Sequence, residues 1–283
     1  MKTLLVVNPI SGGRRAWKNF EVAKRFLGRE YPSVISEYKG YLLEGEHMCS
    51  YNHFVVFGGD GTVNEVVNAV YRCGIKGASI TIVPSGSGND FVKSLPRGKF
   101  INFLPGFFRF SEGKRYFINV VGTGIDAYTA YFAGEVKGKY LRGIPAYSYG
   151  LIKTMVMDKG VIDVNKTSVG MSGKLSLLAF GRGSYVGGGF YLLPHADPKK
   201  STVAWLFADY ISFGELLRNV HILFDGSILD FYKVKYGDEE SIDVFLKEPK
   251  IFQIDGEILE NVQEFTVSVA YIPIKVRWIR PLV

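Results

Sequence analysis

Three short segments rich in glycine carry the residues of this chain that are best suited to chemistry. They read NPISGG (Asn8–Gly13), GGDGT (Gly58–Thr62) and PSGSGND (Pro84–Asp90), and each directly follows a short apolar run typical of a β-strand. Glycine lets backbone N–H groups approach phosphate oxygens closely, and a helix predicted to begin at Val63 would add the positive end of its dipole. One such loop is often only a tight turn, but three together indicate a cradle for a polyphosphate.

Asp60 stands among the glycines of the second loop, and we expect its carboxylate to be exposed there. A carboxylate beside phosphates is favourable mainly where a cation lies between them, and Mg²⁺ is the usual cation. Asp60 is therefore the predicted magnesium residue. The GxGxxG dinucleotide fingerprint and the Walker A pattern are both absent, so the predicted cradle is of another kind.

The first part of the chain must position these loops, and in it apolar runs alternate with helical patterns. The predicted strands and helices are, in order, Leu4–Val7, Ala16–Leu27 (helix), Phe54–Phe57, Val63–Tyr71 (helix) and Ile80–Val83. This alternation indicates an α/β domain with a mostly parallel sheet. Its strands would bring the three loops together at their carboxyl ends, where ligands bind.

Beyond about Arg115 the pattern changes to many short strands punctuated by glycine. The predicted strands are Lys174–Phe180, Val203–Asp209, Leu229–Tyr236, Ser241–Leu246 and Glu264–Tyr271, with helices near Lys139–Met155 and Phe213–Leu223. This part is predicted to be a β-rich domain of antiparallel, sandwich-like sheet. We place the first domain at residues 1–113 and the second at residues 114–271, and we expect the tail of residues 272–283 to return to the first domain.

Composition favours a folded protein with an anionic partner. Of the 283 residues 47% are hydrophobic, and Lys+Arg 34 against Asp+Glu 27 give a net charge of +7. This charge suits a nucleotide or an acidic membrane surface, and a solvated basic face is an equally common explanation. Cys49 and Cys73 lie outside any CxxC spacing, so we expect a reducing cytoplasm and neither a disulfide framework nor a zinc site.

The three loops, in this order and spacing, resemble those of the soluble diacylglycerol kinase and sphingosine kinase type lipid kinases. These kinases share a fold superfamily with NAD kinases and 6-phosphofructokinases. Three later segments strengthen the resemblance, namely NVVGTGIDA (Asn119–Ala127), GGGFYLLPHA (Gly187–Ala196) and QIDGE (Gln253–Glu257). The resemblance implies ATP-dependent phosphorylation of a lipid hydroxyl, with the nucleotide in the cleft between the two domains and Mg²⁺ as the cofactor ion.

The resemblance also implies which residues would act. ATP would be held by residues of the three loops, namely Asn8, Pro9, Ile10, Ser11, Gly12, Gly58, Gly59, Asp60, Gly61, Thr62, Val63, Asn64, Ser87 and Asn89. Asp60 would face the phosphates and the magnesium ion, and three further acids, Asp126, Asp255 and Glu257, would approach the reacting hydroxyl. Relatives are usually assigned the last glutamate as general base, here Glu257, with Asp255 as the alternative. Asp-Gly is also a common hairpin turn.

Two segments depart from the family pattern. Where relatives carry an Asp-Asp-Gly loop credited with a structural magnesium, this chain reads PHADPKKSTVAWL, with Lys199-Lys200-Ser201 in place of acids and glycine. These departures weaken the expectation of a structural metal near Asp197–Ser201, and the sequence leaves its presence open. After the second strand the chain presents Tyr38 where relatives tend to have a threonine that contacts the nucleotide.

We expect a lipid substrate taken from a membrane surface, attraction to anionic headgroups, no nucleic acid partner, and a cytoplasmic protein that associates reversibly with the membrane. The aromatic and basic segment Lys137–Gly150 is the candidate for a lipid-facing mouth, and a packed helix is the plainer alternative. An NAD kinase would also carry GGDGT and the Asn64-Glu65 pair, and a non-catalytic nucleotide-binding module is the alternative of another class. The sequence names neither the lipid nor the oligomeric state, and a homodimer stays open.

Overall fold

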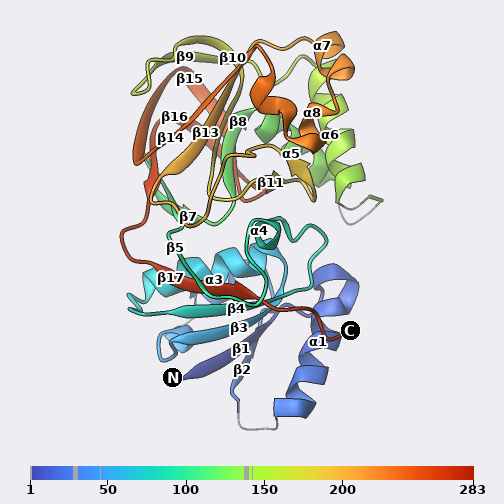
Figure 1. The fold of residues 1–283 in the computed structure, drawn as a ribbon, viewed down its shortest axis with the longest axis vertical. Helices are drawn as coiled ribbons and strands as arrows, with labels where there is room; N and C mark the ends of the chain where they lie inside the picture. The colour runs from blue at the N-terminus through green and yellow to red at the C-terminus, as the bar shows by residue number, and fades with distance from the viewer. Residues whose placement is uncertain (1, 28–30, 45, 137–139, 142) are drawn as a thin grey trace.

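The computed structural model describes residues 2–27, 31–44, 46–136, 140, 141 and 143–283 of the chain. Figure 1 shows two parts, one above the other, each built around its own β-sheet. The upper sheet contains the middle of the chain, and the last strand of the chain runs back into the lower sheet.

The lower part is an α/β unit with a mostly parallel sheet, as predicted. Its strands are β1 (Thr3–Val7), β2 (Ser33–Ile35), β3 (His53–Gly58), β4 (Ser79–Pro84), β5 (Ile101–Phe103) and β17 (Ile274–Trp278), and its helical elements are α1 (Ser11–Leu27), α2 (Tyr41–Glu44), η1 (Glu46–Met48), α3 (Asp60–Arg72) and α4 (Asp90–Lys93). The strand order is β2-β1-β3-β4-β17-β5, and all neighbours are parallel except β17 and β5.

Burial on both faces explains why the parallel strands read as continuous apolar runs. Along β1, Leu4 and Val6 join the hydrophobic cluster that contains α3, whereas Leu5 and Val7 join the cluster on the opposite face with α1. The sheet is therefore covered on both sides and is accessible mainly at its edges and strand ends.

The upper part is β-rich and antiparallel, again as predicted. Its strands are β6 (Gly106–Phe110), β7 (Gly113–Phe117), β8 (Val120–Gly124), β9 (Ile162–Thr167), β10 (Gly173–Gly181), β13 (Val203–Asp209), β14 (Val234–Glu239), β15 (Ser241–Ile254) and β16 (Glu257–Val269), with a separate hairpin of β11 (Tyr185–Val186) and β12 (Phe190–Tyr191). The main sheet runs β14-β13-β10-β8-β15-β16-β6-β7, and β9 pairs with β10 and β15. Figure 1 shows the helical elements gathered on one side of it, namely α5 (Ile125–Val136), α6 (Ile144–Val156), α7 (Phe213–Arg218), α8 (Ile222–Asp225) and η2 (Ser227–Asp230).

The chain crosses from the lower sheet to the upper sheet earlier than the sequence pattern suggested. Strand β6 already pairs with β16 in the upper sheet, so the crossing lies between Phe103 and Gly106 rather than after residue 113. The chain returns after β16, and β17 lies between β4 and β5 of the lower sheet. Among the described residues, no helix is both long and apolar enough to cross a membrane.

Cys49 and Cys73 form a disulfide, so the expectation that the two cysteines are unlinked is wrong. Cys49 follows η1, and Cys73 caps the carboxyl end of α3. Between them the chain runs through β3 and back along α3, which brings the two Cα atoms to 5.2 Å although they are 24 residues apart. The spacing of the two cysteines in the sequence did not indicate the disulfide, because they come close only when α3 runs back along β3.

Candidate functional site

The three glycine loops meet where β1, β3 and β4 end, as their parallel arrangement requires. A cleft of about 440 Å³ opens there and is lined by residues of both parts of the molecule. At Gly59 and Gly86 the second and third loops are in backbone contact, because a Cβ atom on Gly86 would lie 2.5 Å from the Cα atom of Gly59. Glycine at both positions therefore lets the two loops form one surface.

Most of the residues predicted to hold ATP face this cleft or the pocket beside it. The cleft is lined by Asn8, Ile10, Ser11, Gly12, Gly59, Asp60, Gly61 and Ser87. Thr62 lines an adjoining pocket of about 290 Å³, and Tyr38 lies in the same wall, as its place after the second strand suggested. As far as the described residues go, Pro9, Gly58, Val63, Asn64 and Asn89 line neither space. Val63 packs in the core, and the Asn89 side chain binds the Gly86 backbone.

Asp60 is half-buried, so the expectation of an exposed loop carboxylate is wrong. Its Oδ2 accepts a hydrogen bond from the N–H of Asp90 and its Oδ1 from the N–H of Phe91, each at 3.0 Å. The carboxylate thus fastens the GGDGT loop to the start of α4. Burial, and then the nearby Asp90 carboxylate, raise the pKa of Asp60.

Asp90 is the partner acid that the sequence did not single out, although it ends the third glycine loop. Its Oδ1 accepts from the Lys93 ammonium at 2.7 Å, and its Oδ2 accepts from the N–H of Gly188 at 2.6 Å. Two carboxylates facing one phosphate-sized cleft fit a magnesium ion, which binds through one or two carboxylates together with substrate phosphates. Among the described residues no group of three His, Cys, Asp or Glu side chains could hold a metal ion unaided.

Asp255 joins the two parts of the molecule. Its Oδ2 accepts from the Asn64 side chain and from the N–H of Ile118, both at 2.7 Å, and its Oδ1 accepts from the N–H groups of Asn119 and Val120 at 2.9 and 3.0 Å. Burial raises the pKa of Asp255 to about 6, and the hydrogen bonds from these four donors oppose that shift.

Asp255 and Gly256 also form a hairpin turn, which was the alternative prediction for this Asp-Gly pair. Both residues have positive φ, 49° and 84°, and Ile254 pairs with Glu257 across them. The turn therefore holds the carboxylate of Asp255 against its four donors. Because both oxygens of this carboxylate already accept hydrogen bonds, Asp255 connects α3 to the start of β8 and is not a free proton acceptor.

Glu257 is held at the other side of the cleft by two cations. Its Oε1 lies 3.0 Å from the Lys39 ammonium and its Oε2 lies 3.1 Å from the Arg115 guanidinium. Lys39 belongs to the lower part and Arg115 to β7 of the upper sheet, so the carboxylate bridges the two. Glu257 also lines the pocket that contains Tyr38 and Thr62.

Asp126 is the second residue of α5 and lies deeper in the cleft. A Cβ atom on Gly122 would come within 2.2 Å of Asp126 Oδ2, so glycine in β8 makes room for the carboxylate. The Gln253 side chain donates a hydrogen bond to the same oxygen at 2.6 Å. Burial raises the pKa of Asp126 to about 6, and the Gln253 hydrogen bond opposes that shift.

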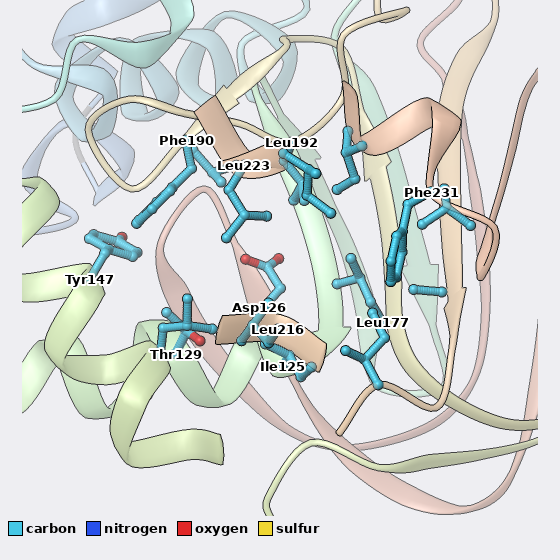
Figure 2. Close-up of a pocket in the computed structure, with 17 residues that line it drawn as sticks. Ile125, Asp126, Thr129, Tyr147, Leu177, Phe190, Leu192, Leu216, Leu223 and Phe231 are labelled. Carbon is cyan, nitrogen blue, oxygen red and sulfur yellow. The ribbon is translucent and has the colours of Figure 1, made fainter. Parts of the chain in front are cut away.

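Asp126 also projects into a second, apolar cavity. Figure 2 shows its carboxylate pointing into a space bordered by Tyr147, Leu192 and Leu223, among others. The complete lining is Ile125, Asp126, Thr129, Tyr147, Leu151, Leu177, Val186, Phe190, Leu192, Ala208, Ile211, Leu216, Ile222, Leu223, Ile228, Phe231 and Val234. Asp126, Tyr147 and Val186 line both the cleft and this cavity, so the two spaces adjoin at Asp126.

The sequence pattern revealed parts of this arrangement and missed others. Tyr147 comes from the segment Lys137–Gly150 that we expected near the lipid, of which residues 137–139 and 142 lie outside the described residues. Gln253 stands in the quoted QIDGE motif but was assigned no role. The apolar wall itself comes from six or more separated elements, and no local pattern could have shown it.

Comparison with known proteins confirms the resemblance. The family described as Diacylglycerol kinase catalytic domain matches residues 2–104. A Staphylococcus carnosus protein named "Putative lipid kinase" is 29% identical over 174 residues, which cover 58% of this chain and 56% of that protein. The matched part of the chain thus spans about half the length of that relative.

Solved structures share the fold over nearly the whole chain. A structure titled as a diacylglycerol kinase from Bacillus anthracis covers 96% of both chains with a TM-score of 0.66 at 18% identity. An NAD kinase from Archaeoglobus fulgidus in complex with ATP covers 97% of this chain and 92% of its own, with a TM-score of 0.51 at 13% identity. At these identities the two structures show the shared fold alone.

Proposed function

We propose that this protein is a lipid kinase that transfers the γ-phosphate of ATP to a hydroxyl group of a lipid. One observation carries the proposal: a glycine-lined, phosphate-sized cleft and an apolar cavity adjoin at a single half-buried carboxylate, Asp126. A soluble acceptor such as NAD would find almost no polar partners in the cavity, whereas an acyl or alkyl chain is what such a lining favours.

ATP would bind along the three loops of the lower part. Its phosphates would lie against the backbone N–H groups of GGDGT and the amino end of α3, with magnesium at Asp60 and Asp90. Magnesium would neutralise charge on the transferring phosphate. The pocket beside the cleft, which contains Thr62 and Tyr38, would receive the nucleoside. The match of residues 2–104 to the kinase catalytic domain supports this half of the proposal.

The acceptor hydroxyl would lie at Asp126, with the lipid chain in the cavity behind it. In the transfer, the hydroxyl oxygen forms a bond to the γ-phosphorus and the bond from that phosphorus to the β,γ-bridging oxygen breaks, releasing ADP. The hydroxyl proton goes to the Asp126 carboxylate. A buried carboxylate with a raised pKa is a better proton acceptor near neutral pH than an ordinary one. Glu257, neutralised by Lys39 and Arg115, would instead orient the nucleotide side of the cleft.

The lipid would enter between α6 and the short helices α7 and α8. In this structure the cavity is narrow, about 90 Å³, so a long chain requires these walls to move apart. The outer faces of the same helices expose apolar side chains, with Ile152 and Val156 52% and 67% exposed on α6, and Leu217 and Phe224 55% and 46% exposed on α7 and α8. Exposed apolar side chains around a lipid cavity favour contact with a membrane surface.

The proposal is tested by incubating the purified protein with γ-labelled ATP, magnesium and mixed vesicles of a total lipid extract. We expect label in the organic extract, and identification of the labelled product names the lipid. NAD in lipid-free buffer is the parallel reaction. Label that stays in the aqueous phase, or appears in NADP, would contradict the proposal.

A further inference from the structure

A fully buried arginine binds the loop at which the resemblance implied a structural magnesium in relatives. Arg182 follows β10 and is 1% exposed, which makes it one of the largest fully buried side chains among the described residues. A buried charge is unfavourable unless it is paired or fully hydrogen-bonded. The partners of this guanidinium therefore decide what it does.

The guanidinium is surrounded by backbone carbonyl oxygens. Nη2 donates to the carbonyl oxygens of Pro198 and Lys200, at 2.9 and 2.6 Å, and Nη1 donates to that of Thr202. Nε donates to the Leu104 carbonyl oxygen at 2.8 Å. Three of the four acceptors thus belong to one loop, and they converge on a single cation as metal ligands would.

The same loop does not offer a metal the ligands it needs. Magnesium and calcium require about six oxygen ligands, usually including carboxylates. Between residues 197 and 202 the only carboxylate is Asp197, whose Oδ1 accepts the N–H of Lys199 at 2.9 Å. The nearby Asp238 is paired with the Lys200 ammonium at 2.9 Å. With the carbonyl oxygens engaged by Arg182, the residues present do not fit a structural metal ion.

We infer that the Arg182 guanidinium is the built-in cation of the 198–202 loop and makes a structural metal unnecessary in this chain. Burial lowers the pKa of Arg182 to about 10, and Asp197 and Asp238 oppose that shift, so the group stays charged at neutral pH. The cation is therefore permanent, whereas a metal would depend on its concentration.

This loop matters because it ends the segment that forms one wall of the site. Between Arg182 and Thr202 lie the β11–β12 hairpin, Gly188, which binds Asp90, and Phe190, which lines the apolar cavity. Arg182 lies at the start of this segment and donates hydrogen bonds to the carbonyl oxygens at its end. It also donates to the carbonyl oxygen of Leu104, where the chain crosses between the two sheets. The guanidinium is thus a positioning group for the hairpin.

The first test is metal content and metal dependence of the wild-type protein without nucleotide. We expect elemental analysis to find no stoichiometric divalent metal after gel filtration. We also expect EDTA to leave the melting temperature unchanged. A tightly bound metal at one per chain, or a clear drop in melting temperature with EDTA, would overturn the inference.

The second test compares Arg182→Lys with Arg218→Lys, a matched change at an exposed arginine on α7. Lysine keeps the charge but cannot reach four carbonyl oxygens, so we expect Arg182→Lys to melt at least about 5 °C lower or to fail to fold. Arg218→Lys should behave as the wild type. If Arg182→Lys melts together with the control, the guanidinium is not what holds the loop.

Discussion

At the scale of single residues, five acids line the cleft but have different surroundings, namely Asp60, Asp90, Asp126, Asp255 and Glu257. Asp60 and Asp255 each accept backbone N–H groups, and Glu257 is held between two cations. Among these acids, only Asp126 faces both the cleft and the apolar cavity. In the proposed reaction the acids therefore have different roles: Asp60 holds the GGDGT loop, Asp255 joins the two parts, and Asp126 would receive the proton.

The assignment of the base predicts a difference between two conservative changes. Asp126→Asn should lower kcat on the order of 10²–10⁴-fold, because an amide cannot take the proton, whereas Glu257→Gln should lower it less than about tenfold. In the wild type and in Glu257→Gln, kcat/KM should fall about tenfold per pH unit below pH 6, as the raised pKa of Asp126 requires. Steady-state rates from pH 5 to 8 decide this. The reverse ranking of the two variants would return the role to Glu257.

The stability of Asp126→Asn distinguishes lost chemistry from lost structure. The pKa of Asp126 is raised to about 6 from 3.8, so between these values the folded state binds more protons than the unfolded state. Stability therefore falls as pH rises from about 4 to 6, and above that the buried charge is a constant cost. The neutral variant should melt at or above the wild-type temperature at pH 7.5, and this advantage should vanish near pH 4.

At the scale of elements, the disulfide encloses the unit that carries GGDGT. Cys49 and Cys73 are 24 residues apart, and β3, the GGDGT loop and α3 lie between them in the sequence. Closing a loop of this length stabilises by about 3 kcal/mol, roughly 6–12 °C for a chain of this size. We expect dithiothreitol to lower the melting temperature of the wild type by such an amount and to leave the double variant Cys49→Ser, Cys73→Ser unaffected. Equal melting of oxidised and reduced wild type would show that the bond carries no stability.

Elements with a clear period were predictable from the sequence, and those defined by their surroundings were not. Strands β1, β3 and β4 and helix α3 were placed nearly correctly because their apolar runs and glycine boundaries are local signals. Helix α5 was missed because it is apolar on most sides, and such a helix shows no amphipathic period. Asp60 was misplaced for a similar reason, since the N–H groups that it binds lie 30 residues away.

At the scale of the whole molecule, the two parts are joined by contacts between motifs far apart in the sequence. The side chain of Asn64, which lies next to the GGDGT loop, donates a hydrogen bond of 2.7 Å to Asp255, 191 residues further along the chain. Lys39 forms an ion pair with Glu257. Each motif is thus held in place by another, and the cleft between them has a defined width. Tertiary pairs of this kind explain why motif order could predict residues that line the cleft but not the partners that hold them there.

The exposed apolar side chains of α6 to α8 predict how the whole molecule meets its substrate. The protein carries +7 and exposes Ile152 and Leu217 beside the cavity, so activity should require lipid in a vesicle. It should rise with anionic lipid content and fall with salt, because attraction to anionic headgroups is screened. Ile152→Glu and Leu217→Glu should weaken vesicle binding in flotation assays and lower activity together. Tyr271→Glu, the same charge change at a large side chain that is 99% exposed beyond β16, is the control. Activity that is full in lipid-free buffer, or lost equally with the control, would mean that this face does not meet the membrane.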